Sequence, residues 1–535
     1  ENRDVTKDET AFANAVAAFE KADTIKFTST ITNEEAYILQ SLKESKGYKL
    51  VNPEAKAFQN FLNDYSEISG TALYGSDLKV AHDSNFIVSV GTALKTDNPN
   101  ARYAFNNSMT MNKGAGLYFH PVVDPVIEQM GKSVMSINHA PLQEEAALYL
   151  ILDLFADKDK LPASVTEYLA GFHSMKTITV EETIKEKVVE MVKEMKVNEE
   201  TGEEEEVEVE KSKMVPKKVS KEVEVDENRL LEILNAPKDF EENMEKFLKK
   251  KDAFSLIVGP DMYTHPGSKN LARLCALIEK YTAFELVMIP TLTNSLGVSQ
   301  ICDLDDEAGS YSIGYNTEAD FVLSALGNGD LDMPAINQQE GTLTSINKRV
   351  NPTNAALGYG GYVLNDIANA LGMNAELTID YTEALPTAKG FRAEKFDSLP
   401  NHYENDGTEK RGYLLETVAV KTGADENVAA FDEATVEKAI YLANPVRQFS
   451  DFTAKAHQSK EKPGLHASKA YLDANELSEG DKVKVTTAKG EIEVEVSHDH
   501  FIDGDIAYLT TFDSKLKSEA LFDGYRFTTA SIERV

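Results

Sequence analysis

The sequence predicts an α/β protein made of doubly wound domains, with a long charged β-ribbon inserted between them and a small β-barrel at the C-terminal end. Apolar runs alternate with capped amphipathic helices on both sides of a Val/Glu/Lys-rich stretch, and short alternating segments joined by Gly turns fill the last hundred residues. The predicted domains are 1–175, the first doubly wound domain; 176–228, the ribbon; 229–437, the second doubly wound domain with a connecting segment; and 438–535, the barrel.

The composition is that of a globular protein and argues against several kinds of partner. The chain has 535 residues, too many for one ordinary core, and a formal net charge of −34. Such an acidic chain is a poor direct partner for nucleic acid or for an anionic membrane surface. It has no apolar run of about 18 residues, so we expect no direct membrane insertion. The polar start, ENRDVTKDET, has no signal-peptide pattern, and the absent initiator Met is consistent with a piece of a longer polypeptide.

The first doubly wound domain is predicted from strands that lead into helices. Three apolar runs have the length and composition of buried parallel strands: 24–31, 84–90 and 113–120. A helix is predicted at 34–44 with Asn33 as its cap and two glutamates in its first turn. Pro141 opens a long apolar helix, as Pro does at a first helical turn. Strand and capped helix in alternation are typical of βα units.

The ribbon is predicted from a stretch in which valines alternate with charges. Two arms flank the turn-like Thr201-Gly202, and the alternating valines include Val207, Val209, Val223 and Val225. The first arm would also suit a helix, because its apolar residues recur at helical spacing: Ile184, Val188, Met191 and Met195. The insertion is either a solvated excursion or a docking arm whose valines pack on a neighbouring subunit, since a two-stranded ribbon is rarely stable alone.

The second doubly wound domain repeats the pattern after a predicted helix at 229–250. Its strands are predicted at 253–259, 284–290 and 319–323, and further helices at 270–281 and 355–371. The loop at 265–268 precedes a helix and could bind an anion at the helix N-terminus, although it lacks the GxGxxG fingerprint of dinucleotide sites. The stretch 388–423 has little periodicity and is predicted to connect domains.

The last hundred residues predict a small barrel. Strand-like segments occur at 439–446, 482–487, 491–496 and 505–510. A short helix ends near Leu477, and Lys489-Gly490 forms a hairpin turn between two of the strands. Alternating strands joined by Gly turns close into barrels more readily than into open sheets.

Cysteine and histidine supply no metal or catalytic site in this sequence. Cys275 and Cys302 are two isolated thiols, whereas an iron–sulfur cluster normally takes four thiolates. We expect both to be buried and reduced. His120 and His139 follow strand-like segments without a partner at metal-ligand spacing, so both are interpreted as ordinary loop histidines.

The segment 319–350 carries a specific resemblance. ADFVL, a Gly/Asn/Asp loop, EGT and then Asn347 and Arg349 resemble the segment "aDvvLP…EgT…N…gRvq" of the molybdopterin oxidoreductase superfamily. The C-terminal order of helix, EGDKVKV, KGEIEVEV and DGDIAYL resembles that superfamily's molybdopterin-dinucleotide-binding domain, a double-psi barrel. In catalytic members the first segment helps to hold a pterin, so the resemblance implies these loop candidates: Glu340, Gly341, Thr342, Asn347 and Arg349.

The branch of the superfamily is indicated by what this sequence lacks. Catalytic members usually ligate molybdenum or tungsten through a Cys, selenocysteine, Ser or Asp in the first doubly wound domain. This chain has no Cys before Cys275, and a net charge of −34 makes it a poor host for two pterin dinucleotides with their phosphates. The phrases at 32–42, 84–92, 288–298 and 338–350 resemble the G subunit of bacterial NADH:quinone oxidoreductase, respiratory complex I.

That resemblance implies a mainly structural chain without a cofactor or metal of its own. Iron–sulfur clusters are then expected on a missing N-terminal part or on partner subunits, and the partners are other peripheral-arm subunits of a complex that transfers electrons to quinone coupled to proton translocation. The implied location is the cytoplasmic face of the bacterial inner membrane, peripheral through the complex. The five loop candidates would serve packing and loop geometry, with Gly341 allowing a tight turn and Arg349 pairing with a carboxylate.

The alternative is a catalytic bis-molybdopterin molybdenum or tungsten oxidoreductase, similar to formate dehydrogenase, that lacks its N-terminal iron–sulfur segment in this chain. Only under this alternative would molybdopterin be a cofactor here.

Overall fold

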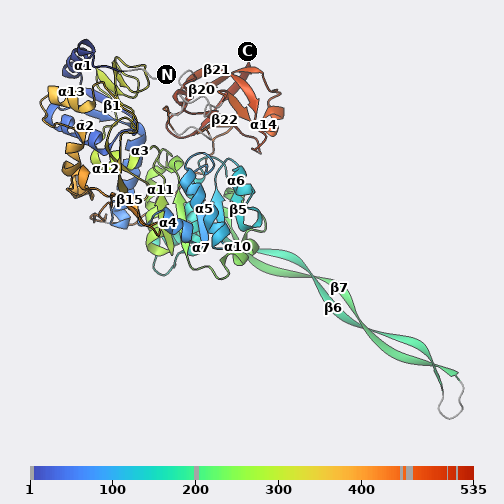
Figure 1. The fold of residues 1–535 in the computed structure, drawn as a ribbon. Helices are drawn as coiled ribbons and strands as arrows, with labels where there is room; N and C mark the ends of the chain where they lie inside the picture. Colours follow the sequence, from blue (N-terminus) through green and yellow to red (C-terminus); the bar gives the residue numbers. More distant parts are fainter. Residues whose placement is uncertain are drawn as a thin grey trace. The chain divides into compact units, whose positions relative to one another are not determined.

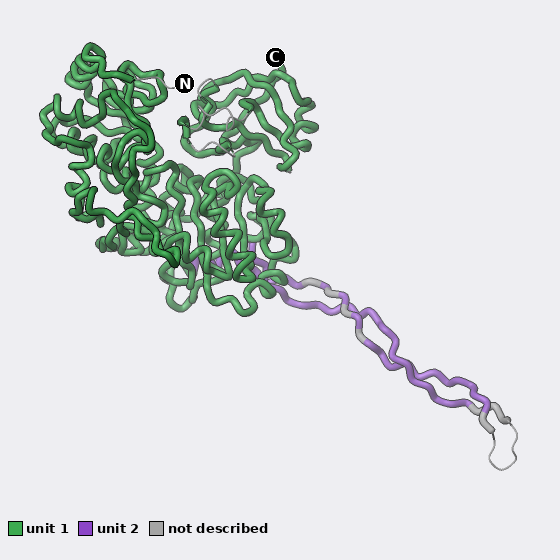
Figure 2. Tube along the Cα trace, in the orientation of Figure 1, with its two compact units in different colours: residues 1–166, 230–535 green, residues 167–229 purple. Residues whose placement is uncertain are grey.

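The protein forms two compact units (Figure 2). The computed structural model describes residues 5–197, 204–423, 425–445, 450–452, 462–502, 504–513 and 516–535. Residues 1–166 and 230–535 make up the larger unit, and residues 167–229 make up the smaller one. The predicted turn at Thr201-Gly202 and the last residue of the strand predicted at 439–446 lie outside the described residues, as do the side chains of Ile184 and Val207.

The first sheet of the larger unit is parallel, with strand order β12-β11-β10-β1-β2. Its strands are β1 (Thr24–Phe27), β2 (Lys49–Val51), β10 (Ser312–Tyr315), β11 (Phe321–Ser324) and β12 (Leu331–Asp332). The helices of this region are α1 (Glu9–Lys21), α2 (Asn33–Lys46), α12 (Ser295–Ile301) and α13 (Leu364–Ala370). Figure 1 shows α1, α2 and α13 near β1. Strand and helix side chains share one apolar core, in which Ile25, Leu39 and Ile313 are fully buried.

The second sheet is also parallel, with strand order β5-β4-β3-β8-β9. Its strands are β3 (Phe86–Val90), β4 (Ala115–Phe119), β5 (Val134–Ile137), β8 (Phe254–Val258) and β9 (Phe284–Met288). The helices around it are α3 (Pro53–Ser69), α4 (Leu78–Asp83), α5 (Pro99–Met111), α6 (Pro125–Glu128), α7 (Glu144–Phe155), α8 (Ala163–Ala170), α9 (Arg229–Ile233), α10 (Phe240–Leu248) and α11 (Ser268–Tyr281). Every residue of β3 and β4 is buried, as continuous apolar runs in a parallel sheet require.

Strand pairing differs from the predicted division of the chain. The first sheet takes β1 and β2 from the region before residue 175 and its other three strands from the region after residue 229, and the second sheet also mixes the two. The chain leaves the first sheet after α3, crosses at 70–78 to the second, and returns after β9. Local patterns identify strands but not their partners, because pairing depends on contacts between residues far apart in sequence.

Several element boundaries differ from prediction for local reasons. The cap of α2 is Thr32 rather than Asn33, because Thr32 and Glu35 form a capping box. The helix predicted at 229–250 is broken into α9 and α10 around Asn235, which has a positive φ, and Pro237. Only the second half of the helix predicted at 355–371 forms, as α13, and the helix opened by Pro141 begins at Glu144.

The segment after the first sheet is a small antiparallel sheet with order β13-β14-β17. Its strands are β13 (Gly341–Thr344), β14 (Arg349–Thr353) and β17 (Tyr413–Leu414), and a separate hairpin pairs β15 (Asn401–Tyr403) with β16 (Glu409–Arg411). The predicted connecting stretch 388–423 therefore contains strand structure of its own. Because β17 pairs with β14, which lies far earlier in the chain, the local sequence carries little periodicity.

The C-terminal region is a seven-stranded, near-closed sheet with order β23-β18-β22-β19-β21-β20-β24. Its elements are β18 (Ala439–Ala443), β19 (Leu465–Ala467), α14 (Lys469–Ala474), β20 (Lys482–Thr487), β21 (Gly490–His498), β22 (Ala507–Thr510), β23 (Phe527–Thr529) and β24 (Ser531–Arg534). The predicted hairpin is confirmed, with its turn one residue earlier, at Ala488-Lys489, because Thr487 pairs with Gly490. The interior holds its own apolar core, including Leu465, Val483 and Val496.

The smaller unit is a two-stranded antiparallel ribbon of β6 (His173–Val197) and β7 (Glu204–Asn228), with every residue of one strand paired to the other. The first arm is thus a strand and not the alternative helix. On one face Val192, Val219 and Val223 are each 36% exposed. Cross-strand ion pairs neutralise much of the charge, as between Lys213 and Glu190 at 2.9 Å.

Among the described residues, none of the helices has the length and apolar character needed to span a lipid bilayer.

The crossing segment 70–78 between the two sheets is fixed by one carboxylate and one ammonium group. Glu279, near the end of α11, accepts a hydrogen bond from Gly75 N at 2.9 Å. Lys348 Nζ donates to Tyr74 O at 2.8 Å and to Ser76 O at 2.7 Å. Burial raises the pKa of Glu279 from 4.5 to about 7. The structure therefore favours the neutral form of this side chain over the charged one.

Replacing Glu279 with Gln is expected to change the pH dependence of stability. A folded-state pKa above the unfolded value means that the contribution of this group is complete below 4.5 and is lost as the pH rises through about 7. Relative to wild type, Glu279→Gln should therefore gain stability between about pH 5 and about pH 8 in urea unfolding. Glu245→Gln, at an exposed position of α10, is the matched control. A difference between wild type and Glu279→Gln that does not vary with pH would contradict the assignment.

Candidate functional site

Thr342, one of the predicted loop residues, is bound to a buried carboxylate at the start of α2. Thr342 N donates to Glu34 Oε2 at 2.7 Å, and Thr342 Oγ1 donates to Glu34 Oε1 at 2.8 Å. Thr382 Oγ1 donates to the same Oε1 atom at 2.8 Å. Burial raises the pKa of Glu34, and the bonds from Thr342 oppose that rise. The polar groups of Thr342 are therefore used within the chain.

Gly341 is needed for close packing rather than for a turn. Its φ is not in the left-handed region, in contrast to the predicted tight turn. A Cβ atom at this position would lie 2.7 Å from Thr32 Cγ2 and 2.9 Å from Glu34 Oε2. Only glycine lets β13 approach the first turn of α2 this closely.

The remaining loop candidates are dispersed. Asn347 Oδ1 accepts a hydrogen bond from Leu78 N at 3.0 Å, at the start of α4. Arg349 Nη1 donates to Arg411 O at 2.8 Å, and its Nε lies 3.7 Å from Glu409 Oε2. Glu340 is exposed. These three residues do not converge with Gly341 and Thr342 on one ligand site.

The carboxyl edge of the first sheet, where its strands end, is filled by a network of side chains. Asn33 Nδ2 donates to Thr342 Oγ1 at 3.0 Å, and Asn294 Nδ2 donates to Asn33 Oδ1 at 3.1 Å. Thr344 N completes the network with a bond to Asn294 Oδ1 at 2.8 Å. All of these residues are buried. An open α/β sheet binds ligands at this edge, and here the hairpin β13-β14 takes that place.

The carboxyl edge of the second sheet carries a cluster of charges that sequence analysis missed. Arg526, just before β23 of the barrel, makes a bidentate pair with Asp97 at 2.9 and 2.7 Å and also donates through Nε to Asp261. Burial alone would raise the pKa of Asp97, but the Arg526 guanidinium outweighs it and lowers the pKa. His120 lies 3.1 Å from Asp261 Oδ2 through Nε2. Both aspartates and His120 are fully or almost fully buried.

His120 is therefore more than an ordinary loop histidine. Its Nδ1 lies 3.0 Å from Val122 N and 3.1 Å from Val122 O, and its Nε2 lies 3.1 Å from Asp261 Oδ2. The signal that could have located it is positional: His120 directly follows β4, and Asp261 follows β8, on the two strands that flank β3. Sequence spacing could not reveal the third member, because Arg526 lies 429 residues from Asp97.

A second barrel residue occupies the same edge. Tyr525 OH donates to Glu144 Oε1 at 2.6 Å and accepts from Leu142 N at 3.1 Å, at the start of α7. Its ring packs edge-on against His265, with ring centroids 5.2 Å apart. Consecutive barrel residues, Tyr525 and Arg526, therefore enter the edge between the ends of β3, β4, β5 and β8.

These groups do not fit a pterin dinucleotide at the carboxyl edge of the second sheet. The barrel fills the edge, and the cavity lined by Tyr118, Tyr441 and Tyr508 has a volume of about 50 Å³. Sites for ligands of this class need about 300 to 1,000 Å³. Phosphates also favour Arg and Lys, whereas the one guanidinium of this cluster is already held by two carboxylates.

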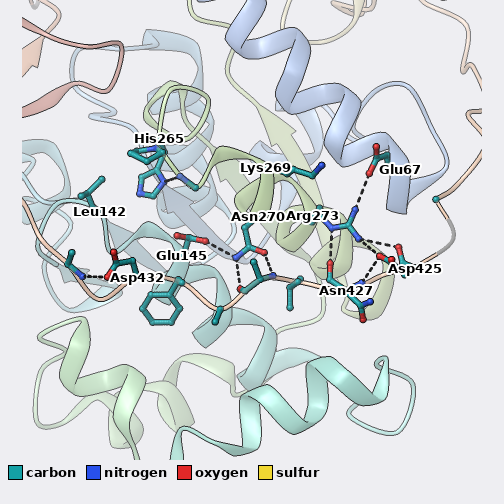
Figure 3. Close-up of a pocket in the computed structure, with 18 residues that line it drawn as sticks. Glu67, Leu142, Glu145, His265, Lys269, Asn270, Arg273, Asp425, Asn427 and Asp432 are labelled. Carbon is teal, nitrogen blue, oxygen red and sulfur yellow. Dashed lines mark hydrogen bonds and ion pairs between the residues drawn. The ribbon is translucent and has the colours of Figure 1, made fainter.

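A larger cavity, of about 900 Å³, lies at the N-terminus of α11, where the sequence suggested an anion site (Figure 3). Its lining includes Glu145, and a Cβ atom on Gly267 would lie 2.5 Å from Glu145 Oε2. Glu145 also accepts a bond from Asn270 Nδ2 at 2.7 Å. The chain's own carboxylate thus lies against this helix N-terminus, where an external anion would have been expected.

One wall of this cavity is the segment 425–434, which lies between β17 of the small antiparallel sheet and β18 of the barrel. Asn270 holds its backbone on both sides, donating to Ala429 O at 3.0 Å and accepting from Ala429 N at 2.8 Å (Figure 3). Arg273 donates to Asn427 O at 2.7 Å and pairs with Asp425 at 3.0 Å. The cavity is therefore bounded by residues 425–434, here called the strap. Asn270 and Arg273 of α11 bond to its main-chain atoms and to the Asp425 side chain.

Thiols and metal-binding side chains offer no coordination site in the described part of the chain. Cys275 and Cys302 are both free and buried, as predicted, and burial raises the pKa of each thiol far above its ordinary value. Among the described residues, no three His, Cys, Asp or Glu side chains are placed to hold one metal ion.

Comparison with known proteins identifies the fold. No known protein family matches the sequence, and no curated protein matches it. Among solved structures, the chain is similar to acetylene hydratase from Pelobacter acetylenicus, with a TM-score of 0.64 and 9% sequence identity over 98% of this chain and 89% of that one. The chain therefore has a molybdopterin-oxidoreductase-like fold, with mixed α/β layers and a near-closed barrel sheet.

Gly341→Ala is expected to destabilise the protein by about 1 to 3 kcal/mol, because the added methyl group must displace Thr32 or Glu34. Gly358→Ala is the matched control, since a Cβ atom there meets nothing within 4 Å. Chemical unfolding measures both variants against wild type. Equal midpoints for Gly341→Ala and wild type would show that the contact between β13 and α2 is looser than these distances imply.

Proposed function

We propose that this chain is a structural component of the peripheral arm of a respiratory NADH:quinone oxidoreductase, similar to the G subunit of that complex. The complex would transfer electrons to quinone coupled to proton translocation, and this chain would supply shape and contact surfaces. The observation that carries the proposal is the filling of both carboxyl edges by the chain's own groups: Glu34 with Thr342 at the first sheet, and Asp97 with Arg526 at the second. These are the places where a fold of this kind would hold a ligand.

The thiols support the same proposal. Cys275 and Cys302 are buried, with pKa values raised by burial, so neither is poised as a thiolate ligand for molybdenum, tungsten or an iron–sulfur cluster. We propose that the clusters of such a complex lie on a preceding part of the polypeptide or on partner subunits. The chain would then reach the cytoplasmic face of a bacterial inner membrane through its partners.

The ribbon is the feature best suited to contact those partners. Two strands alone bury little apolar surface and are marginal in water, yet β6 and β7 each run for 25 residues. Val209, Val219 and Val223 share one face of β7 because they are separated by even numbers of residues. We propose that this face packs on a neighbouring subunit, which would supply the missing layer.

A second candidate function is a catalytic molybdenum or tungsten enzyme that carries two pterin dinucleotides. The match to acetylene hydratase across 98% of the chain favours it, and the 900 Å³ cavity lies in the size range of ligand sites. Under this alternative, ligands would have to bind away from the filled edge of the second sheet.

Metal analysis of the protein purified from its native source separates the two functions. The structural component is expected to co-purify with NADH-oxidising activity and to contain no molybdenum, tungsten or pterin in proportion to this chain. Elemental analysis and pterin fluorescence after acid release are the measurements. Stoichiometric metal with pterin, on protein free of other subunits, would establish the catalytic alternative instead.

Deleting residues 177–226 is expected to weaken assembly with partner subunits without unfolding the larger unit, since the ribbon forms a separate compact unit. Combined Val209→Thr, Val219→Thr and Val223→Thr should act in the same direction, because they keep the strand and remove its apolar face. Met214→Thr is the matched control, being 58% exposed at the opposite parity of β7. Co-purification and native gel mobility report assembly, and undiminished assembly after the deletion would refute the docking role.

A further inference from the structure

Arg526 lies in an enclosure whose chemistry matches a guanidinium group on every side. Asp97 accepts hydrogen bonds from both of its Nη atoms, and Asp261 accepts one from Nε. Its Cζ lies over the ring of Tyr441, 5.0 Å from the ring centroid. We call Asp97, Asp261 and Tyr441 the guanidinium cage. We infer that this cage is a guanidinium-specific binding site, that its ligand is supplied in cis by Arg526, and that its occupancy docks the barrel on the second sheet.

The geometry selects a guanidinium over an ammonium ion. Two parallel N–H bonds to one carboxylate, a third N–H to another carboxylate and a flat face for the Tyr441 ring require a planar fork of donors. A lysine ammonium is a compact point charge that cannot make the bidentate pair and stack at the same time. The side chain of Asn444 adds a bond from Nδ2 to Asp97 Oδ1 at 3.1 Å, which fixes the orientation of that carboxylate.

The charges make an empty cage unstable. Asp97 and Asp261 bring two negative charges, and Arg526 is the arginine or lysine side chain that bonds to both of them in the described structure. Without it, two buried carboxylates would lose the guanidinium that they share, and a buried carboxylate without its cationic partner is strongly unfavourable in a protein interior.

The rest of the barrel contact depends on the cage for its position. Arg526 O accepts a hydrogen bond from Leu442 N at 2.8 Å, which ties the cage ligand to β18. Around the cage, barrel residues Tyr441, Ile502 and Phe527 form a small apolar cluster with Val122 of the second-sheet region. That cluster is limited in size, so the directional part of the contact comes from the charged centre and from the hydrogen bonds of Tyr525 to Glu144 and Leu142.

Chemical rescue of Arg526→Ala tests the inference. In this variant, amide hydrogen exchange of β18 and residues 525–529 is expected to be at least about a hundredfold faster than in wild type, because a buried charge loses its partner. Millimolar methylguanidinium should restore slow exchange and the unfolding temperature, whereas ammonium chloride at the same ionic strength should not. Wild type measured with the same additives controls for effects of the salts themselves.

Two further variants keep the test decisive. Arg526→Lys should behave like Arg526→Ala without additive, since an ammonium group cannot reproduce the planar fork of N–H donors that the guanidinium offers to Asp97 and Asp261. If Arg526→Ala does not yield soluble protein, Asp97→Asn keeps the side-chain shape, and faster exchange confined to β18 and residues 525–529 would support the cage. Rescue of Arg526→Ala by both salts alike, wild-type exchange in Arg526→Lys, or wild-type exchange in Asp97→Asn would each overturn the inference.

Discussion

The structure depends on how two parallel sheets complete their carboxyl edges. At such an edge, strand ends and helix N-termini bring polar groups together, and once these are buried they need partners. In this chain the partners are internal. Glu34 accepts hydrogen bonds from Thr342 and Thr382, and Asp97 accepts hydrogen bonds from both Nη atoms of Arg526. The same bonds position the β13-β14 hairpin and the barrel. The groups that fill each edge therefore also set where these later regions lie.

Under the proposed function, this arrangement would let the fold serve as a scaffold. Fold alone does not determine function, and the groups at the two edges decide what each can do. Here Glu34 accepts hydrogen bonds from Thr342 and Thr382, and the Arg526 guanidinium is already paired with two carboxylates. The strap at 425–434 adds to this rigidity, because Asn270 and Arg273 bond to its backbone and Arg273 also pairs with the Asp425 side chain. Under the proposed function, a chain built in this way would present fixed surfaces to other subunits.

The acidic composition is distributed so that the structure tolerates it. Buried carboxylates are hydrogen-bonded or paired with cations, as Asp97 is with Arg526, whereas much of the remaining negative charge lies on exposed positions. In the ribbon, lysines of β7 pair with glutamates of β6, as Lys217 does with Glu186 at 2.9 Å. The valine-bearing face of the ribbon therefore carries little uncompensated charge, which lowers the barrier to packing against an apolar partner surface.

Local sequence alone determined the strands, several helices and the barrel hairpin. Neighbouring residues encode the continuous apolar runs that form β3, β4 and β8. They also encode the hairpin between β20 and β21. The ribbon's first arm was ambiguous, because its apolar spacing suits a helix and a strand equally until β7 pairs with it. Only tertiary structure decided which strands share a sheet, why Gly341 must be glycine, and that Arg526 closes the edge beside Asp97. Those outcomes join residues hundreds of positions apart, and the energy of a buried contact cannot be assigned until both partners are in place.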